Sequence, residues 1–461
     1  MENRSNLAWK TCLSALIFIF YANSVNAAGF SLVEQGVKGL GNAYAGGAAS
    51  AEDATTVFYN PAGMTRIKGR EFIAGLHTIE PSMRFNNTAS SISPSFGGAA
   101  LTGSDGGDGG VTGFVPNLYY SQELQNGYWV GLGINVPFGL STVYDSNWKG
   151  RYQAVESKIK TLNINPSLAY RFNENLSLGG GVNLQYIEAK LTQAVDFSAV
   201  CLGIPALAAS CTGQSVGVTT LQSSSTAGYS DNTADNWSTG YNLGLLYEFS
   251  PQTRVGLNYR SKIKHKLTGE GDFTIPSAVS GAGSGIGPTV SAIFADAAIT
   301  TYITLPETLS LSGYQQLNNR WAIMADVTRT RWSRIPEVRI SFNSPKSDSV
   351  ERLNWKNSTR YAVGASYLFN ERWTMRTGVA YDQTPIYQTT DRTARLPDND
   401  RRWLSFGASY KASSGMSVDV GYAHLFMSNT PIDRTGALGD KLLGSFQNQV
   451  DILSAQFGWK F

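Results

Sequence analysis

Apolar residues alternate with small or polar residues over unusually long stretches of this chain. Between Leu453 and Phe461, every second residue is apolar, and the same alternation covers residues 162–172, 361–369, 404–410 and 418–426. A repeat of two is the pattern of a β-strand with one apolar face. These stretches are longer than the ~5–6 residues of an average strand. The sequence therefore predicts many long, one-sided strands.

The segments between these strands are of two sizes, and the two sizes alternate strictly. Short connectors lie at 125–127, 173–175, 250–253, 317–320, 370–372 and 412–415; long ones lie at 86–112, 140–158, 191–236, 269–302, 343–354, 384–401 and 428–447. The pattern predicts fourteen antiparallel strands. Even strand number, with short turns at one end and long loops at the other, is typical of outer-membrane β-barrels. A secreted β-sandwich would have shorter strands and more even loops.

Composition supports a strand-built membrane protein. Only 15% of the residues are charged, against about 25% in an average soluble domain. Beyond residue 22 no apolar run approaches the ~18 residues of a spanning helix, which excludes a helical membrane protein. The net charge is +3 and the basic residues are scattered, so no nucleic acid is expected as a partner.

Three histidines, His77, His265 and His424, lie far apart in the sequence. They do not form a metal-binding motif, and no metal or other cofactor is expected. A barrel-embedded lipase would need a serine and a histidine on neighbouring strands, which these scattered positions do not favour. We therefore do not expect an enzyme.

The first 69 residues do not follow the strand pattern. Residues 1–27 combine early basic residues, a short apolar run and small residues at Val25 and Ala27, as in a cleaved signal peptide. Residues 28–69 are rich in Gly and Ala, and a fourteen-stranded barrel is too wide to be filled by its own side chains. We expect residues 28–69 to form a hatch that plugs a barrel of residues 70–461.

Two cysteines, Cys201 and Cys211, follow the predicted signal peptide and lie within one long connector. In an oxidising compartment a disulfide between them is the expected arrangement. Two free buried thiols are the alternative.

Several motifs resemble the FadL-type family of outer-membrane long-chain fatty-acid transporters, which includes porins for aromatic hydrocarbons. They lie at 28–30, 39–44, 60–64, 136–140, 148–152, 163–167, 305–307, 376–378, 382–385, 396–401 and 421–424. The resemblance runs from the predicted cleavage site to Phe461. It implies a hydrophobic ligand that extracellular loops capture, a hatch that moves, and passive release sideways through a gap at the third strand.

The resemblance assigns two groups of residues. The ligand-binding and gating hatch residues are Phe30, Asn60, Pro61 and Ala62, and the strand kink comprises Asn135, Val136, Pro137, Phe138 and Gly139. Proline in a strand without a free edge indicates an interruption, because it has no N–H to donate. From the residues alone, Pro137 also fits the end of a strand at the membrane rim. Likewise, Asn60-Pro61 also fits an ordinary turn.

Six charged residues lie in or near the tenth to twelfth predicted strands: Arg360, Arg376, Asp382, Asp398, Asp400 and Arg401. On the lumen face they would hold the hatch through charge-assisted hydrogen bonds. The alternatives are that one of the basic residues binds a fatty carboxylate, or that the charges pair among themselves. No single residue is assigned to a carboxylate.

The predicted partners follow from this arrangement. They are a fatty acid or hydrocarbon, the lipid bilayer with its lipopolysaccharide, and the barrel-assembly machinery, which would recognise the C-terminal strand ending at Phe461. Two apolar connectors, 200–208 and 275–299, are candidate capture surfaces, and the alternative is that they pack on each other to cap the barrel. We expect a monomer in the outer membrane of a Gram-negative bacterium. The first rival is an uptake channel for hydrocarbons on the same fold, and the second a general porin for polar solutes.

Overall fold

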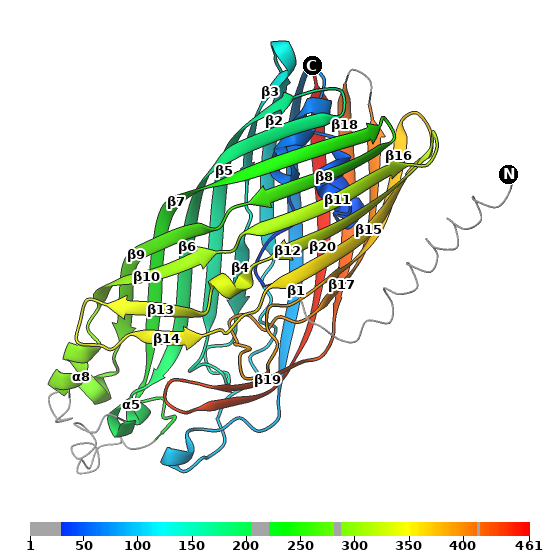
Figure 1. The fold of residues 1–461 in the computed structure, drawn as a ribbon. Coiled ribbons are helices and arrows are strands. Elements are labelled where there is room, and N and C mark those ends of the chain that lie inside the picture. The colour runs from blue at the N-terminus through cyan, green and yellow to red at the C-terminus, as the bar shows by residue number, and fades with distance from the viewer. Residues whose placement is uncertain (1–28, 204–220, 281–286, 413–414) are drawn as a thin grey trace.

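The computed structural model describes residues 29–203, 221–280, 287–412 and 415–461, and the predicted signal peptide at 1–27 lies outside them. Its strands form one antiparallel sheet that closes on itself (Figure 1). The last strand, β20 (Lys441–Lys460), pairs with the preceding wall strand β18 (Met416–Met427) and with β1 (Arg70–Asn87). This second pairing closes the barrel.

The other elements have the following bounds. The strands are β2 (Gly113–Glu123), β3 (Tyr128–Asn135), β4 (Gly139–Val143), β5 (Glu156–Arg171), β6 (Leu176–Asp196), β7 (Ala227–Ser250), β8 (Thr253–Arg260), β9 (Ile263–Thr274), β10 (Ala297–Leu305), β11 (Thr308–Gln316), β12 (Trp321–Thr330), β13 (Glu337–Phe342), β14 (Ser349–Arg352), β15 (Ser358–Leu368), β16 (Trp373–Asp382), β17 (Arg401–Lys411) and β19 (Thr430–Thr435). The helices are α2 (Val37–Gly41), α3 (Gly47–Ser50), α4 (Thr56–Tyr59), α5 (Phe197–Gly203), α7 (Ser277–Ser280) and α8 (Gly287–Ile293), and the 3₁₀ turns are η1 (Pro61–Arg66), η2 (Pro94–Phe96), η3 (Gln125–Gly127) and η5 (Trp332–Arg334).

Within the described residues, fourteen wall strands result when interrupted pieces are joined, which confirms the predicted number and fold. β3 with β4, β8 with β9, and β10 with β11 are pieces of single strands, while β13, β14 and β19 extend the wall into the long connectors. The predicted loops are longer than those of the structure. The first strand, expected at 70–79, reaches Asn87, and the segments 140–158 and 428–447 contain β4 and β19. Strand pairing continues beyond the apolar band because the backbone gains partners there as well.

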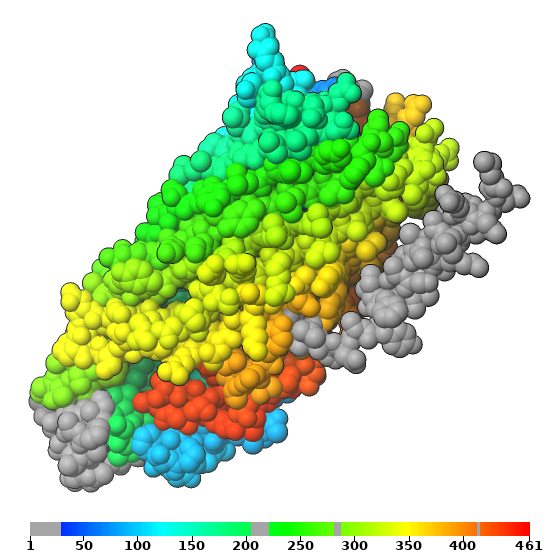
Figure 2. Space-filling model, viewed as in Figure 1, coloured from blue at the N-terminus to red at the C-terminus, as the bar shows by residue number. Residues whose placement is uncertain are grey.

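The outer face of the barrel is apolar. Leu453, Phe457, Trp459 and Phe461 are exposed, whereas Ser454 and Gln456 between them are buried. Aromatic pairs surround the short-turn end, among them Trp321–Tyr367 and Trp373–Tyr410. Such a girdle is expected where a membrane barrel meets the headgroups. Figure 2 shows this outer face over β7 to β12. Among the described residues, no helix is both long and apolar enough to cross a membrane.

Residues 29–69, which we call the N-terminal segment, lie inside the barrel toward its short-turn end (Figure 1, blue). Inward-facing glycines of the wall let its backbone come close. Gly407 of β17 meets Gly41, Gly364 of β15 meets Asn42, and Gly378 of β16 meets the backbone of Asn42. Glycine within a strand often marks such an approach, because any side chain would fill the space.

Candidate functional site

The third wall strand is interrupted. β3 ends at Asn135 and β4 begins at Gly139, so Val136, Pro137 and Phe138 lie outside both pieces. β2 pairs with β3 only through residues 118–123, and β4 pairs with β5 but not with β2. Residues 113–117 of β2 are therefore paired on one side only, toward β1. We call the space between them and β4 the wall opening; it lies where the sequence predicts a kink.

Residues 30–32, which we call the strap, cover the wall opening from the inside. Their backbone bridges the interruption: the Leu32 N–H donates to the Pro137 carbonyl at 2.9 Å, and the Gly139 N–H donates to the Phe30 carbonyl at 3.0 Å. The Gln35 side chain donates to the Val136 carbonyl at 2.7 Å. The N-terminal segment thus supplies hydrogen-bond partners that a neighbouring strand provides elsewhere in the wall.

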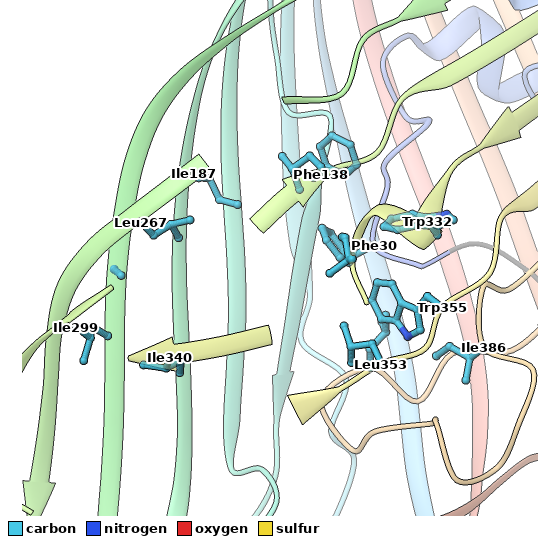
Figure 3. Close-up of a cluster of buried hydrophobic side chains, with 14 residues drawn as sticks. Phe30, Phe138, Ile187, Leu267, Ile299, Trp332, Ile340, Leu353, Trp355 and Ile386 are labelled. Carbon is cyan, nitrogen blue, oxygen red and sulfur yellow. The ribbon is translucent and has the colours of Figure 1, made fainter. Parts of the chain in front are cut away.

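Phe30 is buried in an aromatic cluster (Figure 3). Its ring centroid lies 5.8 Å from that of Phe138, 5.1 Å from Trp332 and 6.0 Å from Trp355. Tilted and edge-on rings at such spacings attract each other beyond the area that they bury. The cluster therefore fixes the strap between the interrupted strand and the long connectors.

An apolar cavity lies beside Phe30, on the long-loop half of the barrel. Inward residues of β6, β9 and β10 line it, together with residues of the connectors. Its apolar lining comprises Phe30, Leu140, Ile159, Ile187, Ala189, Leu191, Ala234, Leu267, Ile299, Ile303, Ile335, Val338, Ile340, Leu353, Trp355 and Leu396. Among the polar residues that also line it is Arg395, whose Nε donates to Glu351 at 3.2 Å.

The sequence reasoning missed this cavity. Ile187 occupies an inward position of β6, where a small or polar residue was expected, and Leu191, predicted to lie in a long connector, is an inward residue of the same strand. The available signal was a change in pattern, because the inward residues turn from Asn183 and Gln185 to apolar ones along the same strand. Trp332 and Trp355 lie in connectors and gave no periodic signal.

The apolar cavity and the wall opening share residues. Phe30, Leu140, Ile159 and Leu396 line both. The wall opening also contacts Val115, which is buried, and Phe114, which is 67% exposed on the outer face. Residues of both faces of the wall therefore border one space, and Phe30 lies between it and the apolar cavity.

Asp398 and Arg401 bind the start of the N-terminal segment. The Gly29 N–H donates to Asp398 Oδ2 at 2.8 Å, and Arg401 Nη2 donates to the Gly29 carbonyl at 2.9 Å. Arg401 also donates to Asp398 Oδ1 at 2.9 Å, and Thr384 donates to Oδ2 at 2.7 Å. Asp398 is buried with all of these partners. Breaking such a buried charged pair from one side is costly.

The other four charged candidates differ in what they contact. Arg360 donates to the Ala43 carbonyl at 2.6 Å, and Arg376 donates to Glu52 at 2.7 Å, so both hold the N-terminal segment. Asp382 is buried among the lumen charges at the end of β16. Asp400 instead accepts a hydrogen bond from Tyr381 of the wall at 2.6 Å.

A second anchor was not predicted from the sequence. Lys38 lies 3.1 Å from Asp53 within the N-terminal segment. Gln456 of β20 donates to Asp53 at 3.0 Å and to Asp419 at 3.1 Å, and it accepts from the Val37 N–H at 3.0 Å. The signal was the presence of charged residues in a segment otherwise rich in small ones.

Asn60, Pro61 and Ala62 pack against β6 and β7, two and three wall strands from the interruption. Asn60 Nδ2 donates to the carbonyls of Ala48 at 2.6 Å and Leu245 at 2.9 Å, and Asn60 Oδ1 accepts from the Ala62 N–H at 3.0 Å. Gly244 and Gly179 of the wall leave room for this turn. The motif thus joins two parts of the N-terminal segment to the wall.

Glu34 is buried beside the strap and borders the wall opening. Burial raises the pKa of its carboxyl group from 4.5 to about 7, against the opposing effect of the Arg401 and Arg360 charges. Since the charged form is disfavoured in the folded protein, Glu34 lowers stability as the pH rises from 4.5 through 7.

We expect Glu34→Gln to remove this pH dependence. Relative to the unchanged protein, its free energy of unfolding should rise by about 2 to 3 kcal/mol between pH 5 and pH 8. Urea unfolding in detergent, followed by tryptophan fluorescence at both pH values, measures the difference. A difference of the same size at both pH values would contradict the assignment.

The predicted disulfide falls partly outside the described residues. Cys201 is buried in α5, and Cys211 is outside, so their pairing stays a prediction. The described parts of the two apolar connectors pack together through Val200, Val279 and Val290. In the described part of the chain, no cluster of three or more metal-ligating side chains occurs.

Comparison with known proteins identifies the family to which this barrel belongs. The profile of the family described as "Outer membrane protein transport protein (OMPP1/FadL/TodX)" matches residues 18–461. The chain belongs to the FadL/TodX family. It is 33% identical over 441 residues to outer membrane protein P1 of Haemophilus influenzae, covering 93% of this chain and 92% of the relative. It is 31% identical over 435 residues to the long-chain fatty acid transport protein of Escherichia coli K12, covering 94% and 95%.

Solved structures of FadL/TodX proteins have the same fold. A FadL homologue of Pseudomonas aeruginosa superposes with a TM-score of 0.84 at 27% identity, covering 94% of this chain and 100% of that one. The toluene transporter TbuX of Ralstonia pickettii, with a TM-score of 0.62 at 22% identity over 91% and 98% of the two chains, shares the fold. The predicted family, barrel and outer-membrane location are confirmed: this FadL/TodX protein is a transport protein and not an enzyme.

Proposed function

We propose that this protein carries long-chain fatty acids passively across the outer membrane. The long connectors capture the ligand, the apolar cavity holds it, and the wall opening releases it into the bilayer once the strap moves. The observation that carries this proposal is the position of Phe30, which lines both the cavity and the opening. The 31% identity to the fatty acid transport protein of Escherichia coli supports it.

Sideways release has an energetic reason. Each methylene group gains roughly 0.8 kcal/mol on leaving water, so a long acyl chain favours an apolar site by on the order of 10 kcal/mol. Release into periplasmic water would have to return this free energy. Release from the apolar cavity through the wall into lipid does not, because the chain stays in apolar surroundings throughout.

The gating movement is confined to the start of the N-terminal segment. The strap and Phe30 lie across the path, whereas Asn60 and Asp53 fasten the later part of the segment to β7 and β20. We propose that ligand binding displaces Phe30 from its aromatic cluster. Asn60, Pro61 and Ala62 then serve as the fixed part of the hatch against which the strap moves.

The chemistry of the cavity bears on the choice of ligand. Arg395 is a cationic group on its lining, which favours a ligand with a carboxylate. Its Nη2 already donates to Gln193 at 2.8 Å, and its Nε donates to Glu351. The alternative is a neutral hydrocarbon, which the otherwise apolar lining favours. A general porin for polar solutes fits less well, because the N-terminal segment lies in the bore.

Uptake of radiolabelled oleate and toluene by cells that lack their own transporters tests the proposal. We expect oleate uptake to depend on this protein and to fall when Arg395 is replaced by glutamine. Toluene uptake that depends on the protein, without oleate uptake, would establish the hydrocarbon alternative. Monomeric action and recognition of β20 by the barrel-assembly machinery remain proposals.

Phe30→Ala should weaken the barrier between the apolar cavity and the wall opening. Loss of a buried phenylalanine ring removes about 3 kcal/mol or more of packing. Only part of that packing resists opening, so we expect a bound fluorescent fatty acid to dissociate on the order of 10-fold faster. Stopped-flow displacement measures this rate. The matched control is Val279→Ala, which shortens a buried side chain between the two apolar connectors. An equal effect of both variants would contradict the role of Phe30.

A further inference from the structure

Three lysines form a row on the outer face of β9 and the residues just before it. Lys262, Lys264 and Lys266 are exposed, while Ile263 and His265 between them are buried. Successive side chains of a strand point to opposite faces, so the three ammonium groups lie on the lipid side of the wall. Figure 2 shows this side of the barrel. We call these residues the lysine row.

The lysine row lies at the height of the outer headgroups. Lys266 pairs in register with Tyr302 of β10, which is 67% exposed. Trp237 of β7, which is 54% exposed, adds a second outward aromatic ring near this level. Lys264 lies eleven residues beyond the start of β8 at Thr253. At ~3.3 Å per residue and a usual tilt this spans about 28 Å, close to the ~25 Å height of the apolar band.

The lysine row differs from other lysines at the same end of the wall. Lys160 pairs with Glu188 at 2.9 Å, and Lys190 pairs with Glu156 at 3.1 Å. Among the described residues, no ion pair joins any member of the lysine row to a carboxylate. Three like charges on alternate residues of one strand repel each other. Anionic groups from outside the chain would therefore stabilise the lysine row.

An apolar surface continues from the lysine row toward the short-turn end. Tyr259 pairs in register with Leu243 on one side and Leu309 on the other, and Leu257 pairs with Leu311. Leu243, Leu309 and Leu311 are each between 46% and 54% exposed. This apolar surface, which we call the leucine strip, is wide enough to accept several hydrocarbon chains side by side.

We propose that the lysine row binds the phosphate groups of lipopolysaccharide in the outer leaflet, with its acyl chains on the leucine strip. A molecule with two phosphates and several acyl chains matches three neighbouring cations above a wide apolar surface. A phospholipid with one phosphate and two chains would use only part of the surface. This inference does not depend on the transported ligand.

Native mass spectrometry of the detergent-solubilised protein with bis-phosphorylated lipid A tests the proposal. We expect the variant Lys262→Gln/Lys264→Gln/Lys266→Gln to bind lipid A on the order of 100-fold more weakly, since each of the three lysines near an anionic surface contributes about fivefold. The matched control is Lys68→Gln/Arg372→Gln/Lys411→Gln, which replaces three exposed cations of the short-turn end. A loss below threefold, or an equal loss in the control, would overturn the proposal.

Two further probes separate the possible sources of the anion. Phosphatidylglycerol should bind at least about fivefold more weakly than lipid A, because it has one phosphate fewer and one lysine–phosphate contact contributes about fivefold. Inorganic phosphate at 10 mM should not displace bound lipid A, because it cannot contact the leucine strip. Displacement by inorganic phosphate, or equal binding of the phospholipid, would overturn the assignment to lipopolysaccharide. Unchanged heat-modifiable migration in electrophoresis shows that each variant is folded.

Discussion

Locking the strap to the interrupted strand should stop transport. Ser31 and Phe138 form an antiparallel bridge whose flanking residues exchange the hydrogen bonds. The Cα atoms of such a pair are about 4.5 Å apart, within the range for a disulfide. In the variant Ser31→Cys/Phe138→Cys, oxidation should reduce oleate uptake to the level of cells without the protein, and a reductant should restore it.

The single variants Ser31→Cys and Phe138→Cys are the controls for this experiment. Each changes a side chain without fixing the strap, so uptake should respond only weakly to oxidant. The unchanged protein treated with reductant controls for its own cysteines. Full uptake in the oxidised double variant, with the new disulfide confirmed by peptide mapping, would show that ligand leaves without movement of the strap.

A single methyl group on the inner wall should loosen the N-terminal segment. A Cβ at position 378 would overlap the backbone of Asn42, which cannot move aside as a flexible side chain could. Overpacking of this kind costs about 3 kcal/mol. We expect Gly378→Ala to accelerate amide hydrogen exchange of residues 37–45 by on the order of 100-fold, because 1.4 kcal/mol corresponds to tenfold in an equilibrium constant.

Gly313→Ala is the matched control. Gly313 also lies in a wall strand, β11, but a Cβ there would meet nothing within 4 Å. Exchange of residues 37–45 should therefore be unchanged. If the two variants behave alike, the glycines serve the folding of the strands and not the seating of the segment. Swelling of liposomes in sugar solutions gives a second measurement, since a loosened segment should admit solutes that the unchanged protein excludes.

The sequence was sufficient for the barrel because two rules act on every wall strand. Lipid requires apolar residues outside, and the inner face that meets the N-terminal segment carries small or polar ones, so Phe457 and Gln456 occupy opposite faces as their alternation predicts. Turn length then separates the two ends of the barrel. The interruption at Pro137 was only half predictable: proline cannot donate to a ladder, but from the residues alone Pro137 fitted the end of a strand at the membrane rim equally well, and the family resemblance favoured an interruption.

The interior was less predictable because its contacts join residues far apart in the sequence. Gly378 fits Asn42, and Gln456 fits Asp53, yet neither pairing leaves a periodic trace. Asp398 and Asp400 illustrate the limit. They are neighbours with the same side chain, but Asp398 binds the N-terminal segment and Asp400 binds Tyr381 of the wall. In a regular strand, two residues of this spacing would point to the same face. Both lie in the irregular connector before β17, where sequence position alone does not assign partners.

The hydrogen bonds between the N-terminal segment and the interrupted strand contribute one part of the work that the proposed opening requires. Three such bonds hold Val136, Pro137 and Gly139. Each contributes about 1 kcal/mol net, so together they amount to only a few times the thermal energy. In the proposed mechanism, the binding of an apolar ligand would break bonds of this strength without nucleotide hydrolysis on the other side of the periplasm.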